Sequence, residues 1–333
     1  MTTPVDRRVV AAHGAAGGGR VGSGSAGSAG SAGSAGSAHD LHVALLDWFA
    51  ANARDLPWRD PAAGAWGVLV SEIMLQQTPV VRVEPRWRDW MARWPTPTDL
   101  AAASPADVLR AWDRLGYPRR ALRLREAAAT IAREHDGRVP TAMADLLALP
   151  GVGTYTAAAV TAFAYRRRAV VLDTNVRRVL ARLIGGQALP PPALLAVESE
   201  RALDLLPDGD EDSARWNAAL MELGALVCTA RSPSCSACPV RTGCAWRRAG
   251  APADAHAAKR RTQAWHGTDR QARGRFLAAL RAAPGPLTTA ELAAVWEPGP
   301  QFERALAGLL ADGLIAADTA PDGVVRGYLL PLT

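Results

Sequence analysis

Lysine and cysteine are almost missing from this chain of 333 residues. Its single lysine is Lys259, so the formal net charge of +6 reflects an excess of arginine. No apolar run reaches the roughly eighteen residues that a membrane span needs, and the short, broken apolar stretch after Arg7 and Arg8 does not resemble a secretory signal. We therefore expect a cytoplasmic protein, and its basic charge favours a polyanionic partner.

The four cysteines fall within one short loop and consist of Cys228, Cys235, Cys238 and Cys244. Four thiolates in one loop indicate a single metal site. Zinc sites usually pair two short knuckles, whereas here only Cys235 and Cys238 are separated by as few as two residues. The uneven spacing therefore favours a [4Fe–4S] cluster over zinc. Two disulfides are disfavoured because no secretory signal precedes the loop.

The chain divides into four segments by composition. Residues 1–38 form a low-complexity tail with Gly-Ser-Ala repeats, which we expect to be disordered. Residues 39–249 show helical periodicity and few strand-like runs, which predicts an all-α domain of roughly ten helices. Ser104 and Pro105, for example, mark a helix start. Residues 250–264 read as a linker rich in alanine, arginine and proline.

The last segment, residues 265–333, has a different pattern. Helical patterns at about 270–282, 288–296 and 300–313 precede two short strands, Leu314–Ala317 and Val324–Leu330, around a turn at Pro321-Asp322-Gly323. Three helices and a hairpin predict a small winged-helix-like module. Such modules bind DNA or mediate protein contacts, and the sequence leaves both open.

The segment Leu149-Pro150-Gly151-Val152-Gly153 lies between two helical patterns. Its glycines allow a tight turn whose backbone N–H groups point outward, and the N-terminus of the next helix adds to this anion-binding site. A helix-hairpin-helix element binds a DNA phosphate in this way without reading sequence. Taken alone, a plain connection between two helices would have the same pattern.

Two carboxylates stand in contexts that suit catalysis. Glu72 interrupts the apolar stretch from Val68 to Leu75, so it lies either on an exposed helix face or in a pocket that raises its pKa, as a general acid requires. Asp173 follows Val171-Leu172 at an expected helix start, where it also fits a simple N-cap. The residues alone do not decide between these alternatives.

Taken together, these segments resemble the helix-hairpin-helix DNA glycosylases with an iron–sulfur cluster. Within that superfamily they are similar to the MutY-type enzymes, which remove adenine mispaired with guanine or 8-oxoguanine. The similarity extends over about residues 40–248. It rests on the hairpin, the cysteine loop and five further segments: Leu56–Arg59, Ser71–Thr78, Leu115–Tyr117, Val171–Val179 and Trp216–Cys228.

The resemblance implies a role for each matching residue. Glu72 protonates the adenine, Asp173 stabilises the cationic sugar, and Asn175 supports that carboxylate. Tyr155 matches a tyrosine that helps to position the site, with local packing as the alternative. Residues implied to contact the DNA or the mispair are Gln76, Gln77, Thr78, Leu115, Tyr117, Arg59, Gly151 and Gly153. The implied partner is double-stranded DNA with an A·G or A·8-oxoguanine mispair, bound by a monomer.

The shortage of lysine bears on the reaction. Endonuclease III, in the same superfamily, cleaves DNA through a lysine Schiff base at the position where this chain has Tyr155. Because no lysine precedes Lys259, we expect a monofunctional glycosylase. A thymine glycosylase for G·T mispairs is one alternative. A non-catalytic iron–sulfur DNA-binding protein is another, but binding alone requires neither Glu72 nor Asp173.

The C-terminal segment departs from the pattern of long MutY-type proteins. Those carry a domain related to Nudix hydrolases that checks for 8-oxoguanine, and residues 265–333 are too short and too helical for it. The chain instead resembles a shortened form found in high-GC actinobacteria. The resemblance therefore leaves open how strongly 8-oxoguanine is preferred over guanine.

Overall fold

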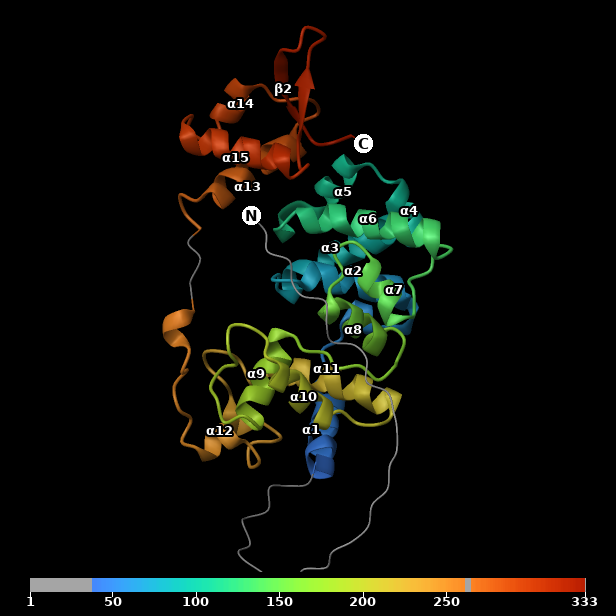
Figure 1. Cartoon of the computed structure of the whole chain (residues 1–333), viewed down its shortest axis with the longest axis vertical. Helices are drawn as coiled ribbons and strands as arrows, with labels where there is room; N and C mark the ends of the chain where they lie inside the picture. The colour runs from blue at the N-terminus through green and yellow to red at the C-terminus, as the bar shows by residue number, and fades with distance from the viewer. Residues whose placement is uncertain (1–37, 261–264, 333) are drawn as a thin grey trace, which may run out of the picture. The chain divides into compact units, whose positions relative to one another are not determined.

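The computed structural model describes residues 38–260 and 265–332. The predicted disordered tail lies outside the described residues except for its last residue, and residues 261–264 of the predicted linker also lie outside them. Helices dominate the described chain, which confirms the expected all-α class (Figure 1). Within the described ranges, no helix combines the length and the apolar character that a membrane crossing requires.

Between Ala38 and Arg248 the described chain forms twelve α-helices, two more than the sequence suggested. They are α1 (Ala38–Asn52), α2 (Gly64–Leu75), α3 (Val80–Arg93), α4 (Pro97–Ala102), α5 (Pro105–Trp112), α6 (Arg119–Glu134), α7 (Met143–Ala148), α8 (Thr154–Phe163), α9 (Thr174–Leu183), α10 (Ala196–Asp204), α11 (Asp210–Leu226) and α12 (Ala245–Arg248). Short 3-10 helices are η1 (Pro57–Arg59), η2 (Pro61–Ala63), η3 (Asp113–Leu115), η4 (Cys235–Ala237) and η5 (Ala257–Lys259).

Helices α2 to α8 pack around a core rich in tryptophan. Trp90 lies edge-on to Trp94 and Trp112, with ring centroids 4.9 and 5.5 Å apart, the geometry that aromatic pairs prefer. Every residue of α2 from Trp66 to Met74 is buried. Because α2 is central to this core, Glu72, the carboxylate it carries, is held away from water.

A second group of helices packs around α11, which lies against α1 and α9. Helix α8 contacts both α2 and α11 and so links the two groups. Gly224 of α11 allows α9 to approach closely, because a Cβ atom there would lie only 2.6 Å from the Cβ of Asn175. This close packing places the first turn of α9 directly on α11.

The C-terminal module contains α13 (Asp269–Ala282), α14 (Thr289–Ala293), α15 (Pro300–Ala311), β1 (Ala316–Thr319) and β2 (Val325–Leu329). The strands pair antiparallel, with Ala316 opposite Leu329. Helices α13 and α15 contact each other, and their Phe276 and Phe302 rings pack edge-on at 4.9 Å. Three helices followed by a hairpin confirm the predicted winged-helix-like architecture.

Candidate active site

Glu72 is a buried carboxyl on α2, with only 4% of its surface exposed. The hydroxyl of Tyr155 donates a hydrogen bond of 2.7 Å to Glu72 Oε2. Burial raises the pKa of Glu72 to about 7, opposed by the Tyr155 hydrogen bond and assisted by the negative charge of Asp173. Of the two placements that the sequence allowed for Glu72, the structure shows the buried one. A carboxyl of this kind is half protonated near neutral pH and can donate a proton.

Asp173 is an N-cap, as one reading of the sequence expected, and its catalytic role stays a prediction. It is the N-cap of α9, where Oδ1 accepts a hydrogen bond of 2.6 Å from the Val176 N–H. Its other oxygen, Oδ2, accepts a bond of 2.7 Å from the side-chain amide of Asn175. Burial raises the pKa of Asp173, and these hydrogen bonds together with the charge of Arg178 oppose that rise. The N-cap thus fixes a carboxylate that also belongs to the site.

Tyr155 joins the two carboxylates into one site. It lies in the first turn of α8, and burial, together with the negative charges of Glu72 and Asp173, raises the pKa of its hydroxyl well above the usual value. The hydroxyl therefore keeps its proton and acts as a hydrogen-bond donor at neutral pH. The structure brings together three residues that are 83 and 18 positions apart in the sequence: Glu72, Tyr155 and Asp173.

The predicted hairpin connects α7 to α8. Gly151 has a φ of 79°, and a Cβ atom there would lie 3.0 Å from the Cβ of Arg123, so a larger residue would meet both strain and crowding. Gly153 is the N-cap of α8 and has no heavy atom within 4 Å of the position that a Cβ would occupy. The N-terminus of the site helix therefore opens onto free space, as an anion-binding turn requires.

The residues expected near the mispair lie on two neighbouring loops. Thr78 Oγ1 donates to the Leu115 carbonyl at 2.9 Å, which joins the loop after α2 to the loop before α6. Gln76 Nε2 lies 3.4 Å from Thr156 Oγ1 on α8. Gln77 and Tyr117 have positive φ angles of 57° and 47°, which are unfavourable for residues with side chains.

Arg120 holds both loops in place and was not anticipated from the sequence. Its NH1 donates to the carbonyls of Ile73 at 2.7 Å and Gln76 at 2.5 Å, and its NH2 donates to Gly116 O at 3.1 Å and Thr78 Oγ1 at 3.2 Å. Burial lowers the pKa of Arg120 to about 10, so it stays charged at neutral pH. One cation therefore stabilises the loop conformations that present Gln77 and Tyr117.

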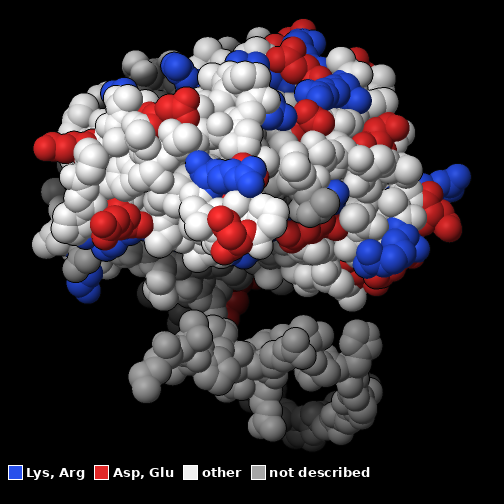
Figure 2. All heavy atoms as spheres, turned by 90° about the horizontal axis from the view of Figure 1, so that it is seen from above, with Lys and Arg blue, Asp and Glu red and all other residues white. Residues whose placement is uncertain are grey.

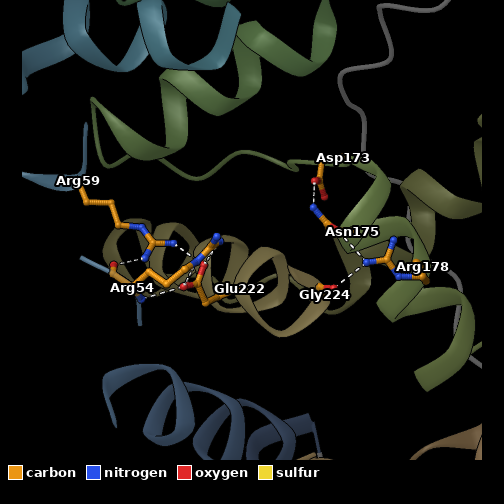
Figure 3. A network of polar contacts seen from close by, with 7 residues as sticks. All are labelled: Arg54, Arg59, Asp173, Asn175, Arg178, Glu222 and Gly224. Carbon is orange, nitrogen blue, oxygen red and sulfur yellow. Dashed lines mark hydrogen bonds and ion pairs between the residues drawn. The ribbon is translucent and has the colours of Figure 1, made fainter. Parts of the chain in front are cut away.

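Arg59, expected at the DNA interface, is engaged inside the protein. Its guanidinium lies 2.9 Å from Glu222 Oε2 and donates to the Arg54 carbonyl (Figure 3). Glu222 also accepts three hydrogen bonds of 2.8 Å from Arg54. Burial alone would raise the pKa of Glu222, but the bonds and charges of the two arginines lower it to about 2. The predicted DNA contact of Arg59 stays a prediction.

A second polar chain runs from the site toward the cysteine loop and was also missed. Arg178 NH2 donates to Asn175 Oδ1 and to the Gly224 carbonyl, both at 2.7 Å (Figure 3). Its Nε donates to the carbonyl of Cys228 at 2.7 Å. Asn175, which bonds to Asp173, is therefore fixed by an arginine that also holds the first cysteine of the loop. Arg178 is three residues after Asn175, one helical turn away, which is the signal that could have revealed it.

Two of the four cysteines contact the end of α9. Arg182 NH1 lies 3.3 Å from Cys228 Sγ, and Cys244 Sγ lies 3.5 Å from the Arg182 carbonyl. Burial raises the pKa of the Cys238 thiol to about 11, and the charges of the other three cysteines add to this rise. Four thiols that repel one another when ionised require a compensating positive charge, which bound iron provides. In the described residues no three potential ligands are grouped tightly enough for a single metal ion. Ligands of a four-iron cluster bind different irons and lie farther apart.

Comparisons with known families agree with this arrangement. The family model described as HhH-GPD superfamily base excision DNA repair protein matches residues 70–203. The model described as iron–sulfur binding domain of endonuclease III matches residues 228–244, which confirms the expected [4Fe–4S] cofactor and its loop. A solved structure titled as a thermostable thymine-DNA glycosylase is 27% identical with a TM-score of 0.58, covering 64% of this chain and 97% of that chain. An endonuclease III–DNA covalent intermediate, 22% identical with a TM-score of 0.55, covers 65% of this chain and 99% of its own and shares the fold.

Relatives of known function are similar over most of the chain. The adenine DNA glycosylase of Mycobacterium tuberculosis strain H37Rv is 53% identical over 83% of this chain and 90% of that protein. The enzyme of Mycolicibacterium smegmatis is 54% identical over 82% of this chain and 92% of its own length. The human adenine DNA glycosylase is 41% identical over 62% of this chain and 39% of its own length. More than half of the aligned residues are identical between this chain and the two mycobacterial enzymes, over nearly the whole length of those enzymes. This chain therefore belongs to the adenine DNA glycosylase family.

Proposed function

We propose that the chain is a monofunctional DNA glycosylase that hydrolyses the N-glycosidic bond of adenine mispaired with guanine or 8-oxoguanine, acting as a monomer in base excision repair. The observation that carries this proposal is the buried Glu72, whose pKa of about 7 suits a general acid. It shares its surroundings with a second carboxylate, Asp173, as the cleavage of a glycosidic bond requires.

Glu72 supplies the proton in this proposal. Adenine is a poor leaving group until a ring nitrogen is protonated, and a carboxyl that is about half protonated at pH 7 can provide that proton. The Tyr155 hydroxyl donates to Glu72 Oε2, so the acidic proton resides on the other oxygen, Oε1. Once ionised, the same carboxylate can accept a proton from the attacking water.

Asp173 stabilises the positive charge that develops on the sugar. A fixed carboxylate in a site that excludes water is effective here because it need not reorganise during the reaction. The hydrogen bonds from the Val176 N–H and the Asn175 amide fix its orientation. Asn175 is thus a positioning residue that acts through Asp173.

DNA contacts follow from the hairpin and the two loops. The turn at Gly151 and Gly153 presents backbone N–H groups to a phosphate without reading sequence. The adenine must leave the base stack to reach a buried acid, and side chains inserted into the stack offset part of the unstacking cost of a few kcal/mol. We assign this insertion to Gln77 and Tyr117, supported by their unusual backbone conformations next to the site.

Cys228, Cys235, Cys238 and Cys244 would hold the [4Fe–4S] cluster, which would cross-link their loop when bound. The protein's own residues connect this loop to the site, through Arg178. No lysine exists before Lys259, so the described catalytic domain has no lysine for Schiff-base chemistry. The product is therefore an abasic site in an uncut strand.

The test is single-turnover base excision on four duplexes, carrying A opposite 8-oxoguanine, A opposite G, T opposite G, and A opposite T. Strand breaks are scored with and without alkali. We expect adenine release from the first two duplexes, with breaks only after alkali. Release of thymine from the third would move the assignment to a thymine glycosylase, the activity named for one similar structure.

A Glu72→Gln variant separates catalysis from binding. The glutamine amide cannot donate an acidic proton, so release should stop while binding to an A·G duplex persists. If the unsubstituted protein bound these duplexes tightly but released no base from any of them, the enzyme assignment would be wrong. The chain would then be a non-catalytic DNA-binding protein.

A further inference from the structure

A groove of about 1560 Å³ separates α13 of the C-terminal module from the loops that carry Gln77 and Tyr117. Ten arginines and two aspartates line it. Six of the arginines come from the segment that runs from α3 to the end of α6, and four come from α13. The lining therefore has eight more positive than negative groups, which exceeds the net charge of +6 of the whole chain.

Acidic residues balance part of this charge, because Asp312 pairs with Arg119 and Arg273, and Asp107 pairs with Arg110 at 3.6 Å. Asp113 pairs with Arg86 at 2.8 Å and Asp269 pairs with Arg304 at 3.3 Å, and both of those arginines lie outside the lining. The exposed guanidinium of Arg275 forms no ion pair with any residue in the described ranges. On the face that Figure 2 presents, basic and acidic side chains are intermixed, so a surface of one sign is not a general feature of the molecule.

One face of helix α13 packs into the core of the module, and another face lines the groove. Ala272, Phe276 and Leu280 are buried in the module, whereas Arg270 and Arg281 line the groove. These two arginines are eleven residues apart, which is about 16 Å along a helix, or the rise of roughly five base pairs. A row of cations of this length matches a stretch of DNA backbone.

The start of α13 touches the loop that we assign to the mispair. The guanidinium carbon of Arg270 lies 4.4 Å from the centroid of the Tyr117 ring and 5.5 Å from that of the Trp265 ring. Both aromatic side chains are more than a third exposed. Arg119 on α6 also pairs with Asp312 of the module at 3.1 Å. Exposed rings beside guanidinium groups are a combination that nucleic-acid-binding surfaces use.

We infer that α13 of the C-terminal module forms the second wall of the DNA-binding groove and contacts duplex phosphates next to the mispair. This inference rests on the proposed function for the identity of the partner as DNA. Arg270 and Arg275 bind phosphates, and Arg270 also connects the module to Tyr117. The module therefore belongs to the DNA-binding machinery, although the glycosylase chemistry is carried entirely by the other helices.

The experiment compares full-length, cluster-loaded proteins carrying Arg270→Ala, Arg275→Ala, both substitutions, or Arg326→Ala. Arg326 is an exposed residue of β2 in the same module and does not line the groove, so it is the matched control. All four are made in the Glu72→Gln background to prevent turnover. Binding to a duplex of about 30 base pairs with an A·G mispair is measured by fluorescence anisotropy over a range of salt concentrations.

Each lost phosphate contact should reduce the slope of log K against log salt by about 0.9. The double substitution should therefore reduce the slope by about 1.8. Between about 50 and about 200 mM salt, affinity of the parent should then fall about tenfold more than affinity of the double variant. The Arg326→Ala control should keep the parent slope.

Parent-like slopes in all variants would overturn the inference. The proposed function is tested separately, by base release from proteins that retain Glu72. Adenine release with unchanged slopes would refute the role of α13 alone. Reduced slopes without adenine release from the parent enzyme would instead refute the glycosylase assignment and support the DNA-binding groove.

Discussion

Replacing Glu72 with glutamine should abolish base release and, at alkaline pH, make the protein more stable. Burial raises the pKa of this carboxyl from 4.5 to about 7. The folded state therefore holds the proton more tightly than the unfolded state, and its stability falls as pH rises from about 4.5 to about 7. A difference of about 2.5 pKa units corresponds to roughly 3 kcal/mol once the pH exceeds 7.

Glutamine carries no charge at any pH and keeps an oxygen that can accept the Tyr155 hydroxyl. The stability advantage of Glu72→Gln should thus be below about 1 kcal/mol at pH 5 and near 3 kcal/mol at pH 8. Urea unfolding at the two pH values, with the cluster absorbance followed in parallel, measures it. An advantage that does not grow between pH 5 and pH 8 would show that Glu72 is not a buried acid with a raised pKa.

Glu222 provides a matched control with the opposite sign. The hydrogen bonds and charges of Arg54 and Arg59 lower its pKa to about 2 despite burial. A lowered pKa stabilises the folded state above the unfolded pKa of about 4.5, and this contribution is lost as pH falls toward 2. Glu222→Gln should therefore destabilise the protein by roughly 3 kcal/mol at pH 5 and pH 8 alike. The contrast between the two glutamate variants separates the effect of Glu72 from any general effect of charge removal.

Three further predictions concern the surroundings of the site. Tyr155→Phe removes the hydrogen bond that lowers the pKa of Glu72, so the alkaline limb of the pH–rate profile should move to higher pH, as single-turnover rates across pH 6 to 9 would show. Arg178→Met removes the hydrogen bonds to Asn175 and to the cysteine loop, so base release should slow by about 10- to 100-fold. Single-turnover rates and iron content are measured together, with Arg177→Met on the same helix as the control. Arg120→Lys keeps the charge, but a lysine side chain cannot hydrogen-bond to both loops at once. Discrimination between A·G and A·T duplexes should therefore fall by roughly tenfold, which corresponds to the loss of one charged hydrogen bond. Unchanged discrimination would contradict the positioning role of Arg120.

Elements with local signals could be predicted from the sequence. Ser104 caps α5 through the Asp107 N–H, with Pro105 in the first turn, as its sequence indicated. The helices of the C-terminal module begin and end within a few residues of the predicted positions, because their apolar periodicity and turn residues are continuous in the chain. The cysteine loop could also be predicted from the sequence, because all four cysteines lie within one short segment.

Properties that depend on distant packing could not be read in this way. Glu72 is buried because α8 packs against α2 and supplies Tyr155, and this contact between distant segments is not visible in the sequence. Arg120 and Arg178 contact carbonyl groups on other elements, which residue type does not reveal, although the spacing of Arg178 from Asn175 is a partial signal in the sequence. Arg59 is an example of the opposite kind. Its motif predicted a contact with DNA, but its guanidinium is bound by Glu222, 163 residues away in the sequence.

Glu72 is buried and Asp173 is partly buried, and their surroundings favour different protonation states. Burial and the negative charge of Asp173 raise the pKa of Glu72 to about 7, and only one neutral hydroxyl opposes this rise, so the carboxyl remains about half protonated at neutral pH. Asp173 sits at the N-terminus of α9, where a backbone N–H, an amide and the nearby Arg178 all favour the charged form. Burial raises both pKa values, but only Asp173 has donors and a cation that oppose the rise on several sides. At neutral pH a proton is therefore held by Glu72 rather than by Asp173, as the proposed roles of acid and anion require. Arg178 fixes Asn175, and Asn175 donates to Asp173, so the arginine that also holds the cysteine loop helps to keep Asp173 in its charged form.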